Sequence, residues 1–410
     1  MLDSAILNHA ARIVSAVTSE VRADAALRHY FLETRRLGPR DKRAISRAVF
    51  AYFRWMQWLD PRASLQKQVA QSAELHETFA RDPKSVKPET LAARAVPEWL
   101  REEMDLPTAY LRQLQHDQPL WLRARPGTAA TLARELGDCS AAGAAADAAV
   151  VPSSGSLVPS SETEAEPESR NRRVSALAHD ALRYTGTHDL FLTQQFQDGA
   201  FEIQDLSSQL VAIACAPQPG QTWWDACAGE GGKTLHLAGL MENKGLVWAS
   251  DRSARRLEIL KRRAARAEVF NYRGALWDGS ARLPTKTKFD GILVDAPCSG
   301  VGTWQRNPHA RWTTSPNDVR ELAATQLTLL SHVAGSLKPG GRLVYAVCTL
   351  TRQETSAVVE KFSAVHPELE PSLVFPQLAA QTLPQDAQRA LLPHELNANG
   401  MFIAAWTRKK

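Results

Sequence analysis

Cysteine is scarce in this chain. The 410 residues contain five cysteines, an odd number, and the sequence has no Cys-x-x-Cys pair, no His-x-x-x-His and no His-Glu-x-x-His motif. A disulfide framework and a zinc site are therefore not expected, and a reducing cytoplasm fits this cysteine usage better. We accordingly predict no bound metal.

Long apolar runs are also missing. No stretch approaches the roughly 18 apolar residues that a membrane-spanning helix needs, so we expect no membrane partner. The first segment, MLDSAILNHAARIVSAV, has neither a basic start nor a long apolar core. These features argue against a secretory signal, and we expect a cytoplasmic protein.

The charge balance favours an anionic partner. The formal net charge is +5 at pH 7, and the isoelectric point is near 9.0. This balance fits RNA, although many basic proteins bind no nucleic acid. The length allows two or three domains, and we expect a monomer.

Residues 1–95 read as helical. Apolar residues recur at helical spacing in residues 6–17, and Ile45, Val49 and Phe53 share one face of a second segment. The basic residues of that segment mostly point away from this face: Arg40, Lys42, Arg43, Arg47 and Arg54. Two interpretations stay open, namely a helical bundle with a solvated basic face and a helical domain that faces RNA.

A small α/β domain is expected over residues 96–198. Its segment PLWLRARPGTAATLARELG reads as a strand, a turn and an amphipathic helix. Residues 139–175 are rich in Ala, Ser, Pro and Glu and have almost no aromatic or large aliphatic side chains. Such a segment cannot bury enough apolar surface to offset its ordering entropy, so we expect a disordered insertion there.

Residues 199–410 alternate short apolar runs with helical patterns. The runs include TWWDA, GLVWAS, FDGILVDAP and GRLVYAV. This alternation predicts βαβ units and a doubly wound, mostly parallel, Rossmann-like α/β sheet. In such a sheet, residues at the carboxyl ends of the strands converge on one ligand crevice.

A glycine-rich turn, CAGEGGKT, follows the first of these strands. Gly229, Gly231 and Gly232 allow the backbone to approach a ligand closely. The GGKT ending resembles a phosphate-binding P-loop, but Cys227 stands where the first glycine of that motif belongs. We therefore favour the nucleotide loop of an enzyme that uses S-adenosylmethionine (SAM).

Acidic residues at strand ends support this cofactor. Asp225 ends the strand before the loop, and Asp251 ends the next strand, about 20 positions past the loop, where an acid binds a ribose hydroxyl. Asp278 follows the third strand, near the expected adenine. The predicted SAM contacts are Asp225, Cys227, Ala228, Gly229, Glu230, Gly231, Gly232, Lys233, Asp251, Arg252, Arg256, Asp278 and Asp295.

The helix expected after Asp251 is strongly basic, with arginines and a lysine between Arg252 and Arg266. A solvated outer face of the doubly wound fold explains this pattern. Electrostatic capture of phosphates is the alternative, and it would make binding dependent on salt.

Two cysteines follow apolar strands directly. Cys298 comes after GILVDAP and Cys348 after RLVYAV, which places both at strand ends near the glycine loop. This placement suggests nucleophilic chemistry, whereas Cys139 and Cys215 read as small buried apolar residues.

The segments DAPCSGVGTWQRNPHARW and VYAVCTL carry a specific resemblance. Over about residues 199–406 the chain resembles the NOL1/NOP2/Sun (RsmB-like) family of SAM-dependent RNA cytosine-5 methyltransferases, and within it the bacterial 16S rRNA enzymes. QDLSSQ, LKPGGRLVYAVCTL and GMFIAAWTRK extend the match. More loosely, residues 1–95 resemble a NusB-type RNA-binding bundle, and residues 96–198 resemble an RRM-like subdomain.

The resemblance implies a covalent mechanism. In the family, a thiolate adds to C6 of cytosine, C5 takes the methyl group, and loss of the C5 proton with elimination of the thiolate restores the ring. It assigns the attack to Cys348 and product release to Cys298. It also implies that Asp295 contacts the N3 and N4 edge of the base, that Lys233 lies near the sulfonium, and that Pro297 holds the base.

The cytosine must leave its stack to meet Cys348, which favours a single-stranded or loosely paired target. Four residues after DAPCSG are candidates to stack on or pair with flanking nucleotides: Trp304, Arg306, His309 and Arg311.

Three positions depart from the family pattern. Gly229 and Glu230 replace Ala and Pro, and Val347 replaces the Thr that usually precedes the attacking cysteine. An RNA cytosine-5 methyltransferase acting on 16S rRNA is the favoured function, with tRNA as the alternative substrate. A catalytically lapsed ribosome assembly factor would be expected to lack a thiol, Asp295 or Lys233, and all of these are present.

Overall fold

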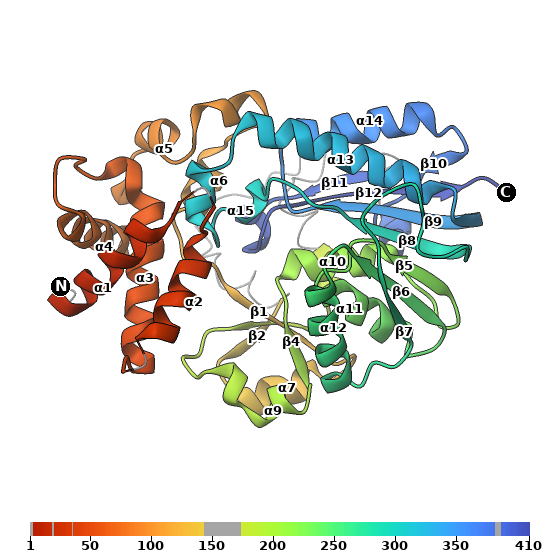
Figure 1. Cartoon of the computed structure of the whole chain (residues 1–410), viewed down its shortest axis with the longest axis horizontal. Helices are drawn as coiled ribbons and strands as arrows, with labels where there is room; N and C mark the ends of the chain where they lie inside the picture. The colour runs from red at the N-terminus through yellow and green to blue at the C-terminus, as the bar shows by residue number, and fades with distance from the viewer. Residues whose placement is uncertain (1–2, 19, 35, 143–173, 382–386) are drawn as a thin grey trace, which may run out of the picture. The chain divides into compact units, whose positions relative to one another are not determined.

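The chain folds into two compact units that differ in architecture. The computed structural model describes residues 3–18, 20–34, 36–142, 174–381 and 387–410. One unit comprises Met1–Gln118 with Ser299–Val319, and the other comprises Pro119–Cys298 with Arg320–Lys410 (Figure 1). Most of the insertion expected at residues 139–175 lies outside the described residues.

The first unit is helical, as the apolar spacing predicts. Its α-helices are α1 (Ser4–Ala16), α2 (Ala23–Glu33), α3 (Pro39–Trp55), α4 (Leu65–Arg81), α5 (Pro88–Arg94) and α6 (Thr108–Gln113). Its 3-10 helices are η1 (Met56–Trp58), η2 (Pro83–Ser85), η3 (Glu98–Glu102), η6 (Val301–Thr303) and η7 (Pro308–Trp312). Ile45, Val49 and Phe53 pack in one core with Ile13 and Val14 of α1.

Arg54 departs from the expected basic surface of α3, because its side chain is buried. One guanidinium nitrogen lies 3.0 Å from the Asp117 carboxylate, and another donates to the carbonyl of Gln305. Burial lowers the pKa of Arg54, and the Asp117 carboxylate opposes that shift. Arg54 therefore links α3 to Asp117 and to the 299–319 segment, which belong to the same unit. The helical unit thus extends past residue 95.

The 299–319 segment packs into the helical unit. Trp304 is fully buried and meets the Trp99 ring edge to face, with ring centroids 6.1 Å apart. The buried guanidinium of Arg311 donates to the carbonyls of Ala95 and Leu114. These contacts hold the segment in a protein core.

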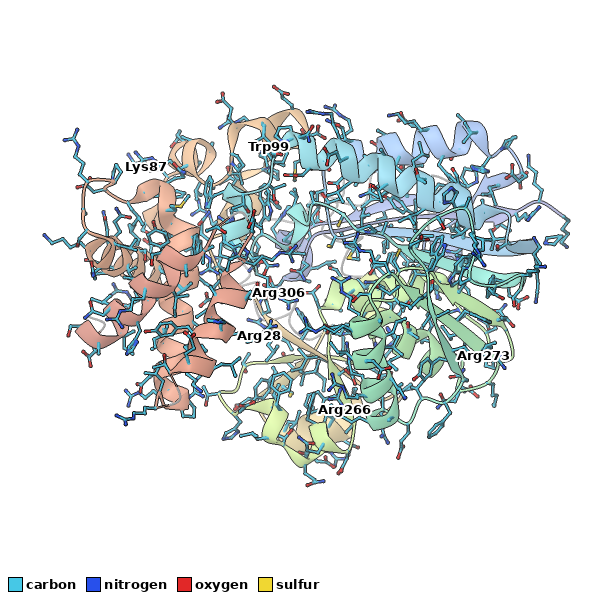
Figure 2. All side chains as sticks on the ribbon, in the orientation of Figure 1. Arg28, Lys87, Trp99, Arg266, Arg273 and Arg306 are labelled. Atoms are coloured by element: carbon cyan, nitrogen blue, oxygen red, sulfur yellow. The ribbon has the colours of Figure 1, made fainter. Side chains whose placement is uncertain are left out.

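This packing corrects part of the expected nucleotide surface. Trp304, His309 and Arg311 are all buried, so neither their ring faces nor their guanidinium edge is open to a base. Arg306 is the exposed member of the four candidates (Figure 2). The partners of Trp304 and Arg311 are groups of the protein itself.

The second unit begins with a small antiparallel sheet. Its strands are β1 (Leu120–Ala124), β2 (Cys139–Ala141), β3 (Ala181–Tyr184) and β4 (Phe201–Ile203), in the order β2-β3-β1-β4. The helices α7 (Ala129–Leu136), η5 (Leu190–Leu192) and α9 (Gln194–Gln197) accompany it. A small α/β layer is therefore present, and it takes its last strand from beyond residue 198.

The large sheet of the same unit is mixed and Rossmann-like, as predicted. Its strands are β5 (Thr222–Asp225), β6 (Leu246–Asp251), β7 (Tyr272–Leu276), β8 (Phe289–Asp295), β9 (Leu337–Val347), β10 (Leu369–Pro371), β11 (Gln388–Leu391) and β12 (Met401–Arg408). The order is β10-β12-β9-β8-β5-β6-β7, and β11 pairs with β12. Strands β5 to β9 are parallel, and β12 runs antiparallel to β9. The order reverses between β5 and β8, where a doubly wound sheet opens its ligand crevice.

Helices cover both faces of the large sheet. They are α10 (Leu206–Cys215), α11 (Gly232–Leu240), α12 (Ala254–Arg266), α13 (Pro316–Ala334), α14 (Ser356–Val365) and α15 (Pro393–Leu396), with the 3-10 helices η8 (Arg352–Glu354) and η9 (Pro376–Gln381). Helices α10 to α12 pack on one face, and α13 and α14 pack on the other (Figure 1). Trp223 and Trp224, adjacent on β5, enter opposite cores. Burial on both faces explains why these strands read as nearly continuous apolar runs.

The described part of the chain contains no helix that is both long and apolar enough to cross a membrane.

Candidate active site

The glycine loop connects β5 to α11 at the reversal of strand order. Gly229 and Gly231 have φ angles of 55° and 86°, in the left-handed region that favours glycine. A Cβ added to Gly231 would lie 2.6 Å from Cγ of Leu260 on α12. Both the backbone conformation and the packing therefore require glycine at position 231.

Two of the predicted acids hold this loop. Asp251 accepts a hydrogen bond from the amide of Gly229 at 3.0 Å. Asp225 is fully buried, and its Oδ2 accepts from the Thr234 hydroxyl at 2.7 Å. Its Oδ1 has no hydrogen-bond partner within the described residues. Burial raises the pKa of Asp225 to about 7, although the Thr234 hydroxyl opposes this shift.

A cleft of about 490 Å³ follows the carboxyl end of β7. Arg252 and Asp278 line it together with the apolar side chains of Trp277, Leu283 and Pro284. Apolar walls with a few polar groups suit a flat heterocycle that carries polar substituents. The cleft brings together two cofactor candidates that lie 26 positions apart in the sequence.

Lys233 and Asp295 form an ion pair at the neighbouring strand ends. Lys233 Nζ lies 2.7 Å from Asp295 Oδ2, and the two side chains are 11% and 27% exposed. Burial disfavours the ammonium, but the Asp295 carboxylate outweighs burial and raises the pKa of Lys233. Lys233 therefore keeps its positive charge in a poorly solvated place.

The two strand-end thiols lie next to each other. The Sγ atoms of Cys298 and Cys348 are 3.3 Å apart, and no disulfide joins them. The contact with the Cys298 thiol lowers the pKa of Cys348 against the effect of burial, and Lys233 acts in the same direction as this contact. A lower thiol pKa increases the thiolate fraction, which is the nucleophilic form. The arrangement can therefore attack an electrophilic carbon with one sulfur while a second sulfur lies beside it.

Two other cysteines of the unit lack this property. Burial raises the pKa of Cys215 and of Cys227, so both remain protonated. A lowered thiol pKa is thus found at Cys348 and not at Cys215 or Cys227.

Comparison with known proteins identifies this arrangement. A family model described as 16S rRNA methyltransferase RsmB/F matches residues 212–407. This part of the chain belongs to the RsmB/F methyltransferase family. The resemblance to the NOL1/NOP2/Sun family is thereby confirmed.

The RsmB/F region has curated relatives. A probable ribosomal RNA small subunit methyltransferase B of Bacillus subtilis is 38% identical over 243 residues, covering 57% of this chain and 53% of that protein. The ribosomal RNA small subunit methyltransferase F of Cronobacter sakazakii is 35% identical over 222 residues, covering 52% of this chain and 45% of that protein. The chain spans about half the length of these relatives.

A solved structure extends the likeness in fold beyond the RsmB/F region. The protein PH0851 superposes with a TM-score of 0.71 at 21% identity, covering 100% of this chain and 99% of that chain. At this identity, the likeness shows a shared fold alone.

Sequence reasoning missed several residues that support the RsmB/F site. Arg263 donates to the carbonyl of Glu230 at 3.0 Å, and Arg123 donates to the carbonyl of Gly232 at 2.9 Å, so both fix the glycine loop. Gln326 and Glu354 are fully buried behind the two thiols. Gln326 stands on the apolar stripe of α13 with Val319, Leu330 and Val333, and a polar residue in such a stripe was the available signal.

Three further candidates of the RsmB/F region are exposed, whereas Ala228, beside the glycine loop, is buried. Pro297, between Asp295 and Cys298, is exposed, and so are Glu230 and Arg256. Arg256 lies 3.9 Å from the Asp251 carboxylate, which orients it weakly.

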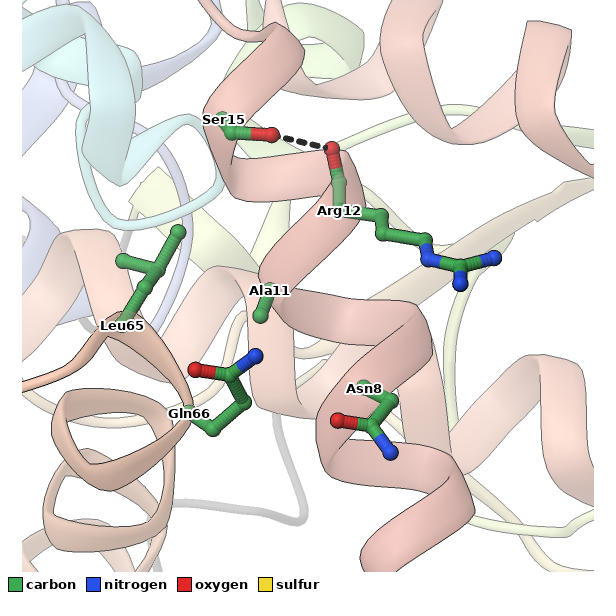
Figure 3. A pocket seen from close by; sticks show the side chains of 6 residues that line it. All are labelled: Asn8, Ala11, Arg12, Ser15, Leu65 and Gln66. Carbon is green, nitrogen blue, oxygen red and sulfur yellow. Dashed lines mark hydrogen bonds between the residues drawn. The ribbon is translucent and has the colours of Figure 1, made fainter.

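Another cleft, of about 350 Å³, lies between α1 and α4 of the helical unit (Figure 3). It is lined by Asn8, Ala11, Arg12, Ser15, Leu65 and Gln66. The Ser15 hydroxyl donates to the Arg12 carbonyl at 2.8 Å. With neither a thiol nor a carboxylate in its lining, this cleft offers no comparable chemistry.

Proposed function

We propose that this chain is an RNA cytosine-5 methyltransferase that uses SAM and acts on 16S rRNA. The observation that carries the proposal is the 3.3 Å separation of Cys298 and Cys348 at the ends of the parallel strands β8 and β9. Replacing hydrogen on C5 of cytosine calls for a thiol that attacks C6 and a group beside it that assists release. The family description and the relatives' names support small-subunit rRNA as the substrate.

The residues around the glycine loop fit SAM. SAM would supply an electrophilic methyl group on its sulfonium. We propose that the loop amides approach its amino acid part and that the open Oδ1 of Asp225 accepts a donor from it. Asp251 would take the ribose hydroxyls, and Asp278 with Arg252 would bound the adenine in the 490 Å³ cleft.

Cys348 would open the reaction on the base. Its thiolate would add to C6, the electron pair of the C5–C6 double bond would move to C5, and C5 would take the methyl group as the methyl–sulfonium bond of SAM breaks and its electron pair stays on sulfur. Asp295, held by Lys233, would bind the N3 and N4 edge of the cytosine and stabilise the added state, while Pro297 holds the ring. Loss of the C5 proton and departure of the Cys348 sulfur restore the double bond, with Cys298 assisting this release.

We also propose roles for the other layers. The helical unit would be a NusB-type RNA-binding bundle, supported by the exposed arginines Arg40, Arg43 and Arg47 of α3. The four-stranded antiparallel sheet would be an RRM-like subdomain. A monomer in the cytoplasm completes this proposal, because the substrate is made there.

Methyl transfer in vitro tests the function. We expect the chain with labelled SAM and an unmodified 16S rRNA transcript to label a cytosine that bisulfite sequencing identifies. Cys348→Ala should abolish labelling, because this proposal assigns the attack on C6 to the Cys348 thiolate and only the release to Cys298. Cys215→Ala, which removes a buried thiol outside the site, is the matched control and should keep turnover.

Each outcome of this test decides something. Turnover by Cys348→Ala contradicts the assignment of the attacking thiol. Labelling of tRNA with none of 16S rRNA keeps the chemistry and changes the substrate. Binding of rRNA without labelling of either RNA supports an assembly factor and overturns the enzyme.

A further inference from the structure

We infer that Gln326 and Glu354 are positioning residues that hold the two thiol loops, residues 296–299 and 348–351, in register. The inference rests on the proposed function. Each would act through the loop that it binds, Gln326 through the carbonyl of Pro297 and Glu354 through the hydroxyl of Thr349.

Gln326 on α13 uses both protons of its amide. Nε2 donates to the carbonyl of Pro297 at 3.0 Å and to Oε1 of Glu354, also at 3.0 Å. Its Oε1 lies 2.9 Å from the Tyr345 hydroxyl, whose proton it shares with the carbonyl of Glu354 at 2.7 Å. Pro297 immediately precedes Cys298, so this amide fixes the backbone on which the releasing thiol stands.

Glu354 ties down the other thiol loop. Its Oε2 accepts from the hydroxyl of Thr349 at 3.0 Å and from that of Thr351 at 2.8 Å. Thr349 immediately follows Cys348. Burying a carboxylate is costly unless donors surround it, and these hydroxyls together with the Gln326 amide supply three. The carboxylate therefore draws the attacking loop toward α13.

One continuous chain of contacts thus joins the two thiols through the protein interior. It runs from Cys348 through Thr349, Glu354 and Gln326 to Pro297 and Cys298. The side chains of Thr349, Glu354 and Gln326 are fully buried, so water does not compete for the bonds between them. Glutamine suits position 326, since it combines two donors with one acceptor, whereas glutamate would place a second carboxylate beside Glu354.

The chemistry gives this link a purpose. Cys298 has to remain close to C5 after Cys348 has bonded to C6, although the two sulfurs stand on different strands. Misplacing a reacting group by about 1 Å costs about 100-fold in rate. Because Gln326 binds the carbonyl of Pro297, next to Cys298, its loss should slow the release of the product more than the attack of Cys348 on C6.

The test is single-turnover kinetics of Gln326→Leu, followed by denaturing gel electrophoresis for a covalent RNA adduct. We expect release to slow by about 100-fold, so that the adduct accumulates although both thiols are present. Cys298→Ala, in which the releasing thiol is missing, serves as the reference for a trapped adduct. The KM for SAM should stay within about twofold, because Gln326 does not touch the cofactor cleft.

A matched control separates positioning from general stability. Gln209 is another buried glutamine of the same unit, and its amide joins the carbonyls of Leu122 and Gln204. Gln209→Leu should lower the thermal midpoint as Gln326→Leu does, without accumulating the adduct. Equal adduct levels in the two variants, or a release rate for Gln326→Leu equal to wild type, would overturn the inference.

A milder pair keeps the test decisive if Gln326→Leu does not fold. Thr349→Val removes the hydroxyl bonded to Glu354 at nearly constant shape, and Thr349→Ser keeps that hydroxyl. We expect single-turnover methylation to fall in the valine variant and to recover in the serine variant. Equal rates in the two contradict the inference. If the wild-type chain itself neither methylates RNA nor forms an adduct, the proposed function fails, which is a separate result.

Discussion

Lys233 brings a positive charge into a poorly solvated site because the Asp295 carboxylate lies 2.7 Å from its ammonium. The charge also acts on Cys348, whose pKa it helps to lower after the larger effect of the Cys298 thiol. A cation favours the thiolate, so removing it should raise the pKa of the attacking thiol.

Lys233→Met tests this coupling. The rate of adduct formation should rise with pH as the Cys348 thiol ionises, and the variant should shift that rise to higher pH. A pH profile of single-turnover adduct formation measures the effect. Lys244→Met, which removes a surface lysine paired with Glu242, should keep the wild-type profile. An unchanged profile for Lys233→Met would contradict electrostatic activation.

Single residues of the site were predictable where topology alone brings them together. Cys298, Cys348, Asp295 and Lys233 follow parallel strands, whose carboxyl ends meet at one edge of a sheet. The role of Gln326 was not predictable in the same way. Its partners, the Pro297 carbonyl and the Glu354 carboxylate, lie in segments that are distant from each other in the sequence. Val347, which departs from the family pattern, is fully buried on β9 and packs in the core beneath α13 and α14.

Helix α3 shows how far a periodic pattern reaches. The spacing of Ile45, Val49 and Phe53 identified its buried face, and the structure confirms it. The pattern missed Arg54, because the cost of burying a guanidinium is offset by Asp117, a residue 63 positions away that no helical period reveals.

The exposed arginines of α3 carry a prediction of their own. In Arg40→Glu with Arg43→Glu, 16S rRNA binding should weaken, and the slope of log affinity against log salt should fall by about 1 to 2, since each lost phosphate contact removes nearly one unit. Filter binding across a salt series measures it. Lys84→Glu with Lys87→Glu reverses as much charge at exposed positions of the unit outside α3. Equal losses in both variants would indicate a net-charge effect and contradict a specific face on α3.

At the scale of the whole molecule, the order of the chain differs from the order of its units. The sequence suggested consecutive domains, but the helical unit takes residues 299–319 from the middle of the RsmB/F region. The local sequence does not indicate that residues 299–319 join the helical unit, because a tryptophan and an arginine fit packing against protein as well as binding to nucleotides. Family likeness has the same limit, as it names the region without saying which unit each segment joins.

A chain shortened to residues 119–410 should therefore behave poorly. It retains the 299–319 segment but loses its partners Ala95, Trp99 and Leu114, so that Trp304 would be exposed and Arg311 would lose two of its carbonyl acceptors. We expect stronger binding of a hydrophobic dye and aggregation on size-exclusion chromatography, compared with the full chain. A monodisperse product without dye binding would contradict this expectation.

Because the helical unit consists of two separate stretches of the chain, its parts are translated at different times. Helices α1 to α6 leave the ribosome first, yet Trp304 and Arg311 are translated about 190 residues after Leu114. At about 5 to 20 residues per second, the unit waits about 10 to 40 seconds for its last piece. During that interval the carbonyls of Ala95 and Leu114 lack the Arg311 guanidinium that binds them in the folded chain, so we expect the nascent helices to be a substrate for a chaperone.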